Sequence, residues 1–447
     1  MYLLSGKYGC LGALVVALNQ ACDGGKRRWY ASTLELQLTC LEICRACRSI
    51  PSLCVRVDDE TPSTLWSPRK SQTRPNTRSS KVRISSRVPV VRALRLTWRL
   101  PMDCLQRDAA VELWTWLEYL HVCGFSSSAN LESVIWPQGL QRLVLDTDWG
   151  TAVTATCWPS SLQQLALKGN FNLSIAGVVW PTSLERLLFG EMFNQPIAGV
   201  VWPSSLQHLT FGEKFNQAIA GVVWPVSLQT LSFGNFFNQP IAGVVWPVSL
   251  QELSFGNFFN QPIAGIVWPT SLQHLWFGYV FNQPVAGVLW PSALQHLSFW
   301  DFFDQPIVDT VWPTSLHDLS FGARFNQPIV GVVWPSSLQQ LRFGSEFNQP
   351  IAGVVWPASL QKLGFGGGFD RPIAGVVWPA SLQQLTFGDD FNQSLAGVVW
   401  PSCLQRLWFG EKFNQRIDEV VWPASLQQLS FGEKFNQPVS GVVWPAS

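Results

Sequence analysis

A tryptophan–proline pair that returns every 22 residues constrains this chain more than any other feature. The spacing never changes, and no insertion interrupts it. A second ladder of phenylalanines runs in step with it, from Phe171 to Phe435. A unit this short cannot bury its own apolar side, so it must stack on its neighbours. The pairs begin at Trp136, Trp158, Trp180, Trp202, Trp224, Trp246, Trp268, Trp290, Trp312, Trp334, Trp356, Trp378, Trp400, Trp422 and Trp444.

Each unit predicts one short strand followed by a return arm. The unit that starts at Trp202 reads WPSSLQHLTFGEKFNQAIAGVV. In it Leu209 and Phe211 alternate with polar residues, which indicates a strand with one buried face. A fixed 22-residue period with L-x-x-L-x-F lies within the range of leucine-rich repeats. We therefore expect a mainly β solenoid, a leucine-rich-repeat-like curved array of 22-residue coils with one parallel sheet on its concave side.

The return arm has its own expected features. Asn216 stands in the bend, where its amide can bond backbone groups of a neighbouring coil. Glycines such as Gly199, Gly221 and Gly243 permit an unusual backbone in the arm. The Val-Val-Trp-Pro segment forms the outer side, and its tryptophan is expected to fill the space between coils.

The run L-x-x-L-x-F-G-x-x-F-N-Q-P-I resembles the FNIP repeat, a variant of the leucine-rich repeat. Asp304 and Asp370 replace the asparagine of this motif, which leaves the bonding of the bend open there. The resemblance covers roughly residues 130–447, and it implies a curved solenoid that takes part in protein–protein interaction. Some family members carry a kinase or F-box segment, but this sequence has no kinase glycine-rich or catalytic loop. The core Phe-Asn-Gln-Pro is intact at Phe193, Phe237, Phe259, Phe281, Phe325, Phe347 and Phe435, and it is altered at Phe171, Phe215, Phe303, Phe369, Phe391 and Phe413.

Composition and periodicity together divide the chain into four parts. Residues 1–60 are a poorly defined segment that could hold one or two short helices, and residues 61–90 are a basic, disordered linker. Residues 91–135 are irregular N-terminal capping coils, since terminal repeats are expected to be atypical. Residues 136–447 are an array of about fourteen repeats. It stops mid-unit without a cap, so we expect the chain to be a truncated part of a longer array.

The formal net charge of +1 hides an uneven distribution. Residues 61–100 carry ten basic and no acidic side chains, whereas residues 101–447 carry 13 basic and 23 acidic ones. A basic stretch rich in serine, threonine and proline is typical of a solvated linker. The alternative is contact with nucleic acid, an anionic surface or the acidic array itself.

Neither the cysteines nor the N-terminus predicts a special site. Cys44 and Cys47 form a CxxC pair, but no second pair follows at zinc-finger spacing, so we expect no metal and no cofactor. Scattered thiols favour a reducing compartment, and hence the cytoplasm. Secretion stays open because Lys7 precedes the apolar run Gly9–Leu18, although Asn19 is a poor cleavage-site residue. That run is half the ~20 residues of a membrane span.

Functional information is expected where the units differ. The residues that flank the inward leucine of each strand point to the concave face, and two adjacent units deviate there together. Trp300 replaces the glycine that most units carry at its position. Clustered exposed aromatic and charged residues are typical of interface hot spots, although drift in a recently duplicated array would produce the same pattern. The candidate partner-binding residues are His274, Trp276, Tyr279, His296, Trp300, Asp301 and Trp408.

Catalysis finds little support in the sequence. His274 and His296 lie one coil apart, but two histidines without a third ligand make a weak metal site. The strand serines, such as Ser298, have no evident base for nucleophilic chemistry. We therefore expect a non-enzymatic scaffold that binds a protein or peptide on the concave face. The alternatives are nucleic-acid or anionic-surface binding through residues 61–100, with nucleic acid the less expected of the two, and extracellular carbohydrate recognition.

Overall fold

The computed structural model divides the chain into two compact units, Met1–Gly190 and Glu191–Ser447. It describes three strands before residue 98, and then residues 118–123, 131, 134, 136–146 and 153–445. The apolar run Gly9–Leu18, the Cys44–Cys47 pair and the predicted linker at 61–90 lie outside the described residues. The predicted boundaries of the four parts therefore remain predictions.

The first unit contains strands that change from antiparallel to parallel pairing. Strand β1 pairs with β2 and β2 with β3 in antiparallel fashion, and β3 to β7 then pair in parallel, each with the next. The described segments of residues 1–60 are two strands, LELQ and CVRV, and the short helices considered for this part of the chain stay a prediction. The strands are β1 (Leu34–Gln37), β2 (Cys54–Val57), β3 (Ala93–Thr97), β4 (Tyr119–Cys123), β5 (Arg142–Asp146), β6 (Gln164–Leu167) and β7 (Arg186–Phe189).

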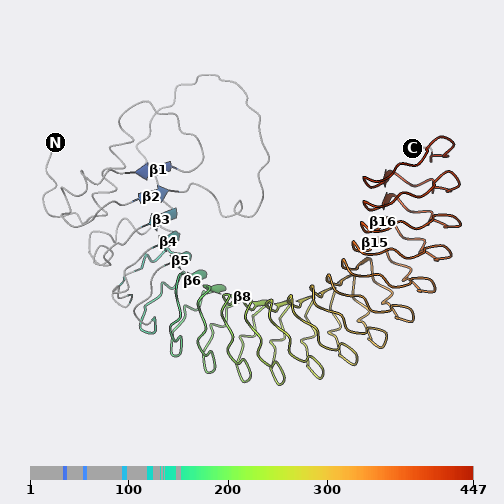
Figure 1. The fold of residues 1–447 in the computed structure, drawn as a ribbon. Helices are drawn as coiled ribbons and strands as arrows, with labels where there is room; N and C mark the ends of the chain where they lie inside the picture. The colour runs from blue at the N-terminus through green and yellow to red at the C-terminus, as the bar shows by residue number, and fades with distance from the viewer. Residues whose placement is uncertain are drawn as a thin grey trace, which may run out of the picture. The chain divides into compact units, whose positions relative to one another are not determined.

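The second unit is a parallel β solenoid, as the sequence predicts. Each strand pairs in parallel with the next, and the paired residues are one repeat apart, as Leu253 and Leu275 are. Its strands lie along the inner side of a curve while the return arms project outward (Figure 1), and the described residues contain no α-helix. The strands are β8 (His208–Thr210), β9 (Thr230–Ser232), β10 (Glu252–Ser254), β11 (His274–Trp276), β12 (His296–Ser298), β13 (Asp318–Ser320), β14 (Gln340–Arg342), β15 (Lys362–Gly364), β16 (Gln384–Thr386), β17 (Arg406–Trp408) and β18 (Gln428–Ser430).

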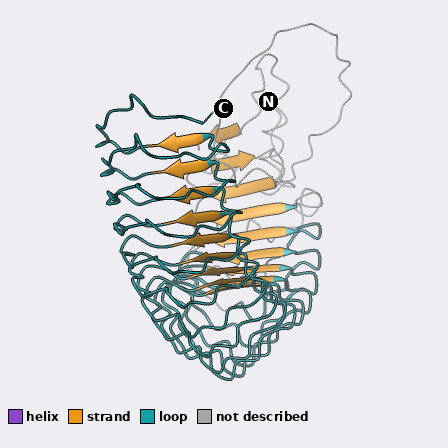
Figure 2. Cartoon of the chain, turned by 90° about the vertical axis from the view of Figure 1, so that its right-hand side faces the viewer, coloured by secondary structure: helices purple, strands orange, loops and turns teal. Residues whose placement is uncertain are grey.

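The core consists of ladders of identical side chains, one rung from each coil (Figure 2 shows the stacked strands). Phe215 and Phe237 stack with ring centroids 6.1 Å apart, and Trp400 and Trp422 stack at 6.2 Å. These rings are almost fully buried, so the tryptophans fill the space between coils as predicted. Burying such large rings against copies of themselves makes each coil depend on its neighbours.

The bend carries a hydrogen-bonded ladder that confirms the predicted role of its asparagine. The Oδ1 atom of Asn216 accepts bonds from the backbone N of Asn238 (2.9 Å) and from Nε2 of Gln239 (3.0 Å). Asp304 keeps the pattern: its Oδ1 accepts from Asn326 N and Gln327 Nε2, both at 2.9 Å. The aspartate keeps both hydrogen bonds because they need only an acceptor oxygen of the side chain.

Two kinds of glycine permit this close stacking. Gly199 in the return arm has φ of +75°, a conformation that confirms the prediction made for it. Gly256, which follows strand β10, serves a different purpose. A Cβ atom there would lie 1.7 Å from the carbonyl oxygen of Gly234 in the preceding coil. At most strands, therefore, neighbouring coils can approach this closely because the second residue after the strand lacks a side chain.

Candidate functional site

The concave face of the second unit presents the first and third residues of each strand. In β11 the central Leu275 is fully buried, and His274 and Trp276 on either side of it are half-buried. The same pattern holds from β8 to β17, except that Arg342 is exposed. Variation at these two positions therefore changes the concave surface without disturbing the core.

The structure brings two of the predicted histidines into direct contact. His274 and His296 are paired across β11 and β12, and their rings stack with centroids 4.6 Å apart and planes 5° apart. Trp276 stacks on His274 from the same strand at 5.5 Å. Burial lowers the pKa of His274 below its ordinary value, and the neighbouring His296 lowers that pKa further, whereas Glu252 opposes the shift.

The other predicted residues of these two coils lie in the turns that follow the strands. Tyr279 and Trp300 are 41% and 50% exposed, and Asp301 is next to Trp300 in the chain. The ring of Tyr279 lies 5.0 Å from that of Phe302 in the next coil, tilted by 58°. Six of the seven predicted residues therefore occupy adjacent coils on the strands and the turns that follow them.

Trp408 does not belong to this group. It is the third residue of β17, six strands beyond β11, and its paired residues are Thr386 and Ser430. It has the same strand position and the same half-buried state as Trp276. Its distance from the group makes it a natural control for the function of Trp276.

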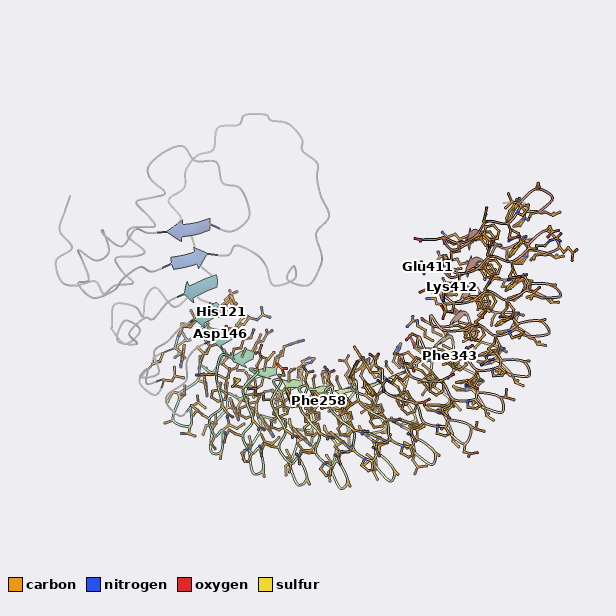
Figure 3. All side chains as sticks on the ribbon, viewed as in Figure 1. His121, Asp146, Phe258, Phe343, Glu411 and Lys412 are labelled. Carbon is orange, nitrogen blue, oxygen red and sulfur yellow. The ribbon has the colours of Figure 1, made fainter. Side chains whose placement is uncertain are left out.

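Sequence reasoning missed three phenylalanines that extend the site. Phe236 and Phe258 lie in the turns after β9 and β10, are 45% and 47% exposed, and stack with centroids 5.0 Å apart (Phe258 is labelled in Figure 3). Phe302 occupies the same turn position after β12. We call Phe236, Phe258, Tyr279 and Phe302 the aromatic row. The signal was available as the repeated run N-F-F-N, in which the first phenylalanine adds to the core motif.

The described part of the chain shows little that could support metal chemistry. No group of three or more histidine, cysteine, aspartate or glutamate side chains in it is placed to hold a metal ion. Cys157 and Cys403 are free and exposed. Within the described part of the chain, no helix is long and apolar enough to cross a bilayer.

Comparison with protein families identifies the repeat. The model described as FNIP Repeat matches residues 193–236, 237–280, 325–368 and 369–412. The chain contains FNIP repeats. Its four matched segments each hold two coils, and they include the coils of β9 and β11. No curated protein matches its sequence.

A solved structure, that of CroV588, supports the leucine-rich-repeat character of this chain. The crystal structure of CroV588, described as a novel circular LRR protein, is 38% identical with a TM-score of 0.65. That alignment covers 79% of this chain and 55% of CroV588, so the chain spans little more than half of that protein. An internalin, InlF, from Listeria monocytogenes str. 4b F2365 is 16% identical with a TM-score of 0.43, over 67% of this chain and 87% of its own.

Proposed function

We propose that this chain is a non-enzymatic module that binds a protein or peptide partner on its concave face. Repeat solenoids of the leucine-rich-repeat kind commonly mediate protein interactions, and the fold is typically non-catalytic. The partner would bind around His274, Trp276, His296 and Trp300, together with the aromatic row.

A single observation supports this location most strongly. The core ladders are nearly uniform from coil to coil, yet large aromatic side chains with 41–50% exposure gather in the turns after β9 to β12. The corresponding turn after β17 holds Glu411 and Lys412 instead (Figure 3). Exposed aromatic clusters stabilise interfaces by burying large rigid surfaces at low entropic cost.

Site-specific photo-crosslinking tests this proposal. A photoreactive amino acid at Ser254, on the concave side of β10, is compared with the same amino acid at Val355, which is 80% exposed on the return arm. We expect a partner in extracts of the source cells to crosslink at Ser254 and not at Val355. Crosslinks confined to Val355 would show that the concave face is not the binding surface.

A matched pair of variants tests the residues themselves. The double variant Trp276→Ala, Trp300→Ala should reduce capture of the crosslinked partner at least tenfold, since aromatic hot spots typically cost 2 kcal/mol or more (~30-fold) when truncated. Trp408→Ala removes a half-buried tryptophan at the same strand position of a distant coil and should leave capture unchanged. Equal capture by the double variant and by Trp408→Ala would exclude this patch.

A further inference from the structure

The aromatic row is held in place by the backbone. The backbone N of Phe258 donates to Asn235 O (2.8 Å), and that of Phe302 donates to Tyr279 O (3.0 Å). Equivalent bonds link the turns of successive coils. The rings of this row are therefore presented on turns that are tied to their neighbours, which lowers the entropy lost when a partner binds them.

One end of the row already binds a guanidinium group. The Cζ atom of Arg324, in the turn after β13, lies 3.8 Å from the ring centroid of Phe302. This is a cation–π contact, in which the positive charge is attracted to the electron-rich face of the ring. The turn positions of this solenoid thus present an aromatic ring in a geometry that a guanidinium can use.

The coils that carry the row contain no lysine and no arginine. Between Lys214 and Arg324 the chain has no lysine and no arginine. The stretch instead holds five carboxylates, and the solenoid beyond it mixes both signs of charge. Of these five, Glu252 and Asp318 lie on strands of the concave face and Asp301 lies in the turn beside Phe302. The five are Glu252, Asp301, Asp304, Asp309 and Asp318.

We propose that the aromatic row binds an arginine-bearing segment of the protein partner. This inference rests on the proposed function and names the chemistry of its partner. Guanidinium groups would pack against the exposed parts of Phe236, Phe258 and Tyr279, whose side chains are 41–47% exposed, with Glu252 and Asp301 supplying negative charge. Arginine fits better than lysine because its planar, weakly hydrated group stacks on aromatic faces.

The stacked histidines give this binding a pH dependence. Glu252 and Asp318 flank the pair on the adjacent strands, and Trp276 stacks on His274. Protonation of His274, which is paired with Glu252 and His296 on the neighbouring strands, adds positive charge to the concave face and repels a cationic partner. Binding should therefore weaken as the pH falls below the ordinary histidine value of about 6.5.

Defined peptides test the proposal on the full chain. A fluorescent twelve-residue peptide of glycine, serine and three arginines is compared with versions carrying three lysines or three glutamates. We expect the arginine peptide to bind tightest, the lysine peptide more weakly, the glutamate peptide not at all, and the affinity to fall with salt and with acid. Arginine and glutamate peptides of equal affinity would overturn the proposal.

Two variants assign the binding to the row. Phe236→Ala with Phe258→Ala should weaken the arginine peptide about tenfold, whereas Phe236→Tyr with Phe258→Tyr keeps the rings and should retain binding. Both rings are about half exposed, and an unchanged thermal unfolding midpoint will verify folding. Unchanged affinity in the alanine pair would refute the assignment. A concave-face partner without arginine at this site would leave the proposed function standing and remove only this inference.

Discussion

The imidazole of His274 stacks face to face on that of His296, with ring centroids 4.6 Å apart. The 22-residue period places these two residues side by side on β11 and β12. Two neutral imidazoles can share this contact, but two imidazolium ions would repel each other. The protonation state of His274 therefore links the charge of the concave face to pH.

The pair predicts a loss of stability in mild acid. Because folding lowers the pKa of His274 below 6.5, the unfolded chain binds a proton more readily than the folded chain. The contribution of this pKa shift to the free energy of unfolding is fully present above pH 6.5, and it decreases as the pH falls below that value. We expect His274→Gln to lose less stability than the wild type between pH 7.5 and 5.5, as measured by urea unfolding at the two pH values. Identical losses would contradict this account.

The asparagine ladder predicts a clear difference between two substitutions. Asn260 Oδ1 accepts bonds from Asn282 N (2.9 Å) and Gln283 Nε2 (3.0 Å). Asn260→Ala leaves both donors without this acceptor and should cost roughly 1–3 kcal/mol. Asn260→Asp retains the oxygen, as Asp304 and Asp370 do naturally, and should cost far less. Thermal unfolding of the two variants checks this, and equal destabilisation would show that the ladder contributes little.

Adjacent valines of the return arm predict opposite sensitivities. Val244 is 7% exposed and Val245 is 80% exposed. Val244→Thr puts a hydroxyl into the apolar core and should cost about 1–3 kcal/mol. Val245→Thr changes a surface residue and should stay within about 0.5 kcal/mol of the wild type. The denaturant midpoints of the two variants test which valine faces the core. A larger effect of the substitution at Val245 would show that Val245, and not Val244, faces the core.

Trp300 predicts a trade-off between stability and binding. It occupies the position at which Gly256 and Gly278 lie so close to the preceding coil that a Cβ would meet a carbonyl oxygen within 2 Å. Overpacking of this kind typically costs about 1–3 kcal/mol. Trp300→Gly should therefore raise the thermal unfolding midpoint while weakening partner capture. A lower midpoint would mean that the coil of Trp300 has adapted fully to its side chain.

The sequence predicts much of the site as well as the fold. The 22-residue period places the two deviating units next to each other, so the contact between His274 and His296 follows from register alone. The exposed ring of Phe236 does not follow in the same way, because it is next to the fully buried Phe237 in an identical pair of residues. Trp276 and Trp408 occupy the same position of the repeat, in β11 and β17. The repeat pattern alone therefore does not distinguish the surroundings of the two tryptophans.

The sequence by itself determined that this chain is a stack of 22-residue coils with leucine, phenylalanine and tryptophan inside. The physical reason is that no single unit can bury its own apolar residues, so a strict period leaves stacking as the solution. The tertiary structure alone decided which of two identical neighbours faces water, as for Val244 and Val245 or Phe236 and Phe237. That choice depends on the direction of the backbone in turns and return arms, where neither helix nor strand periodicity applies.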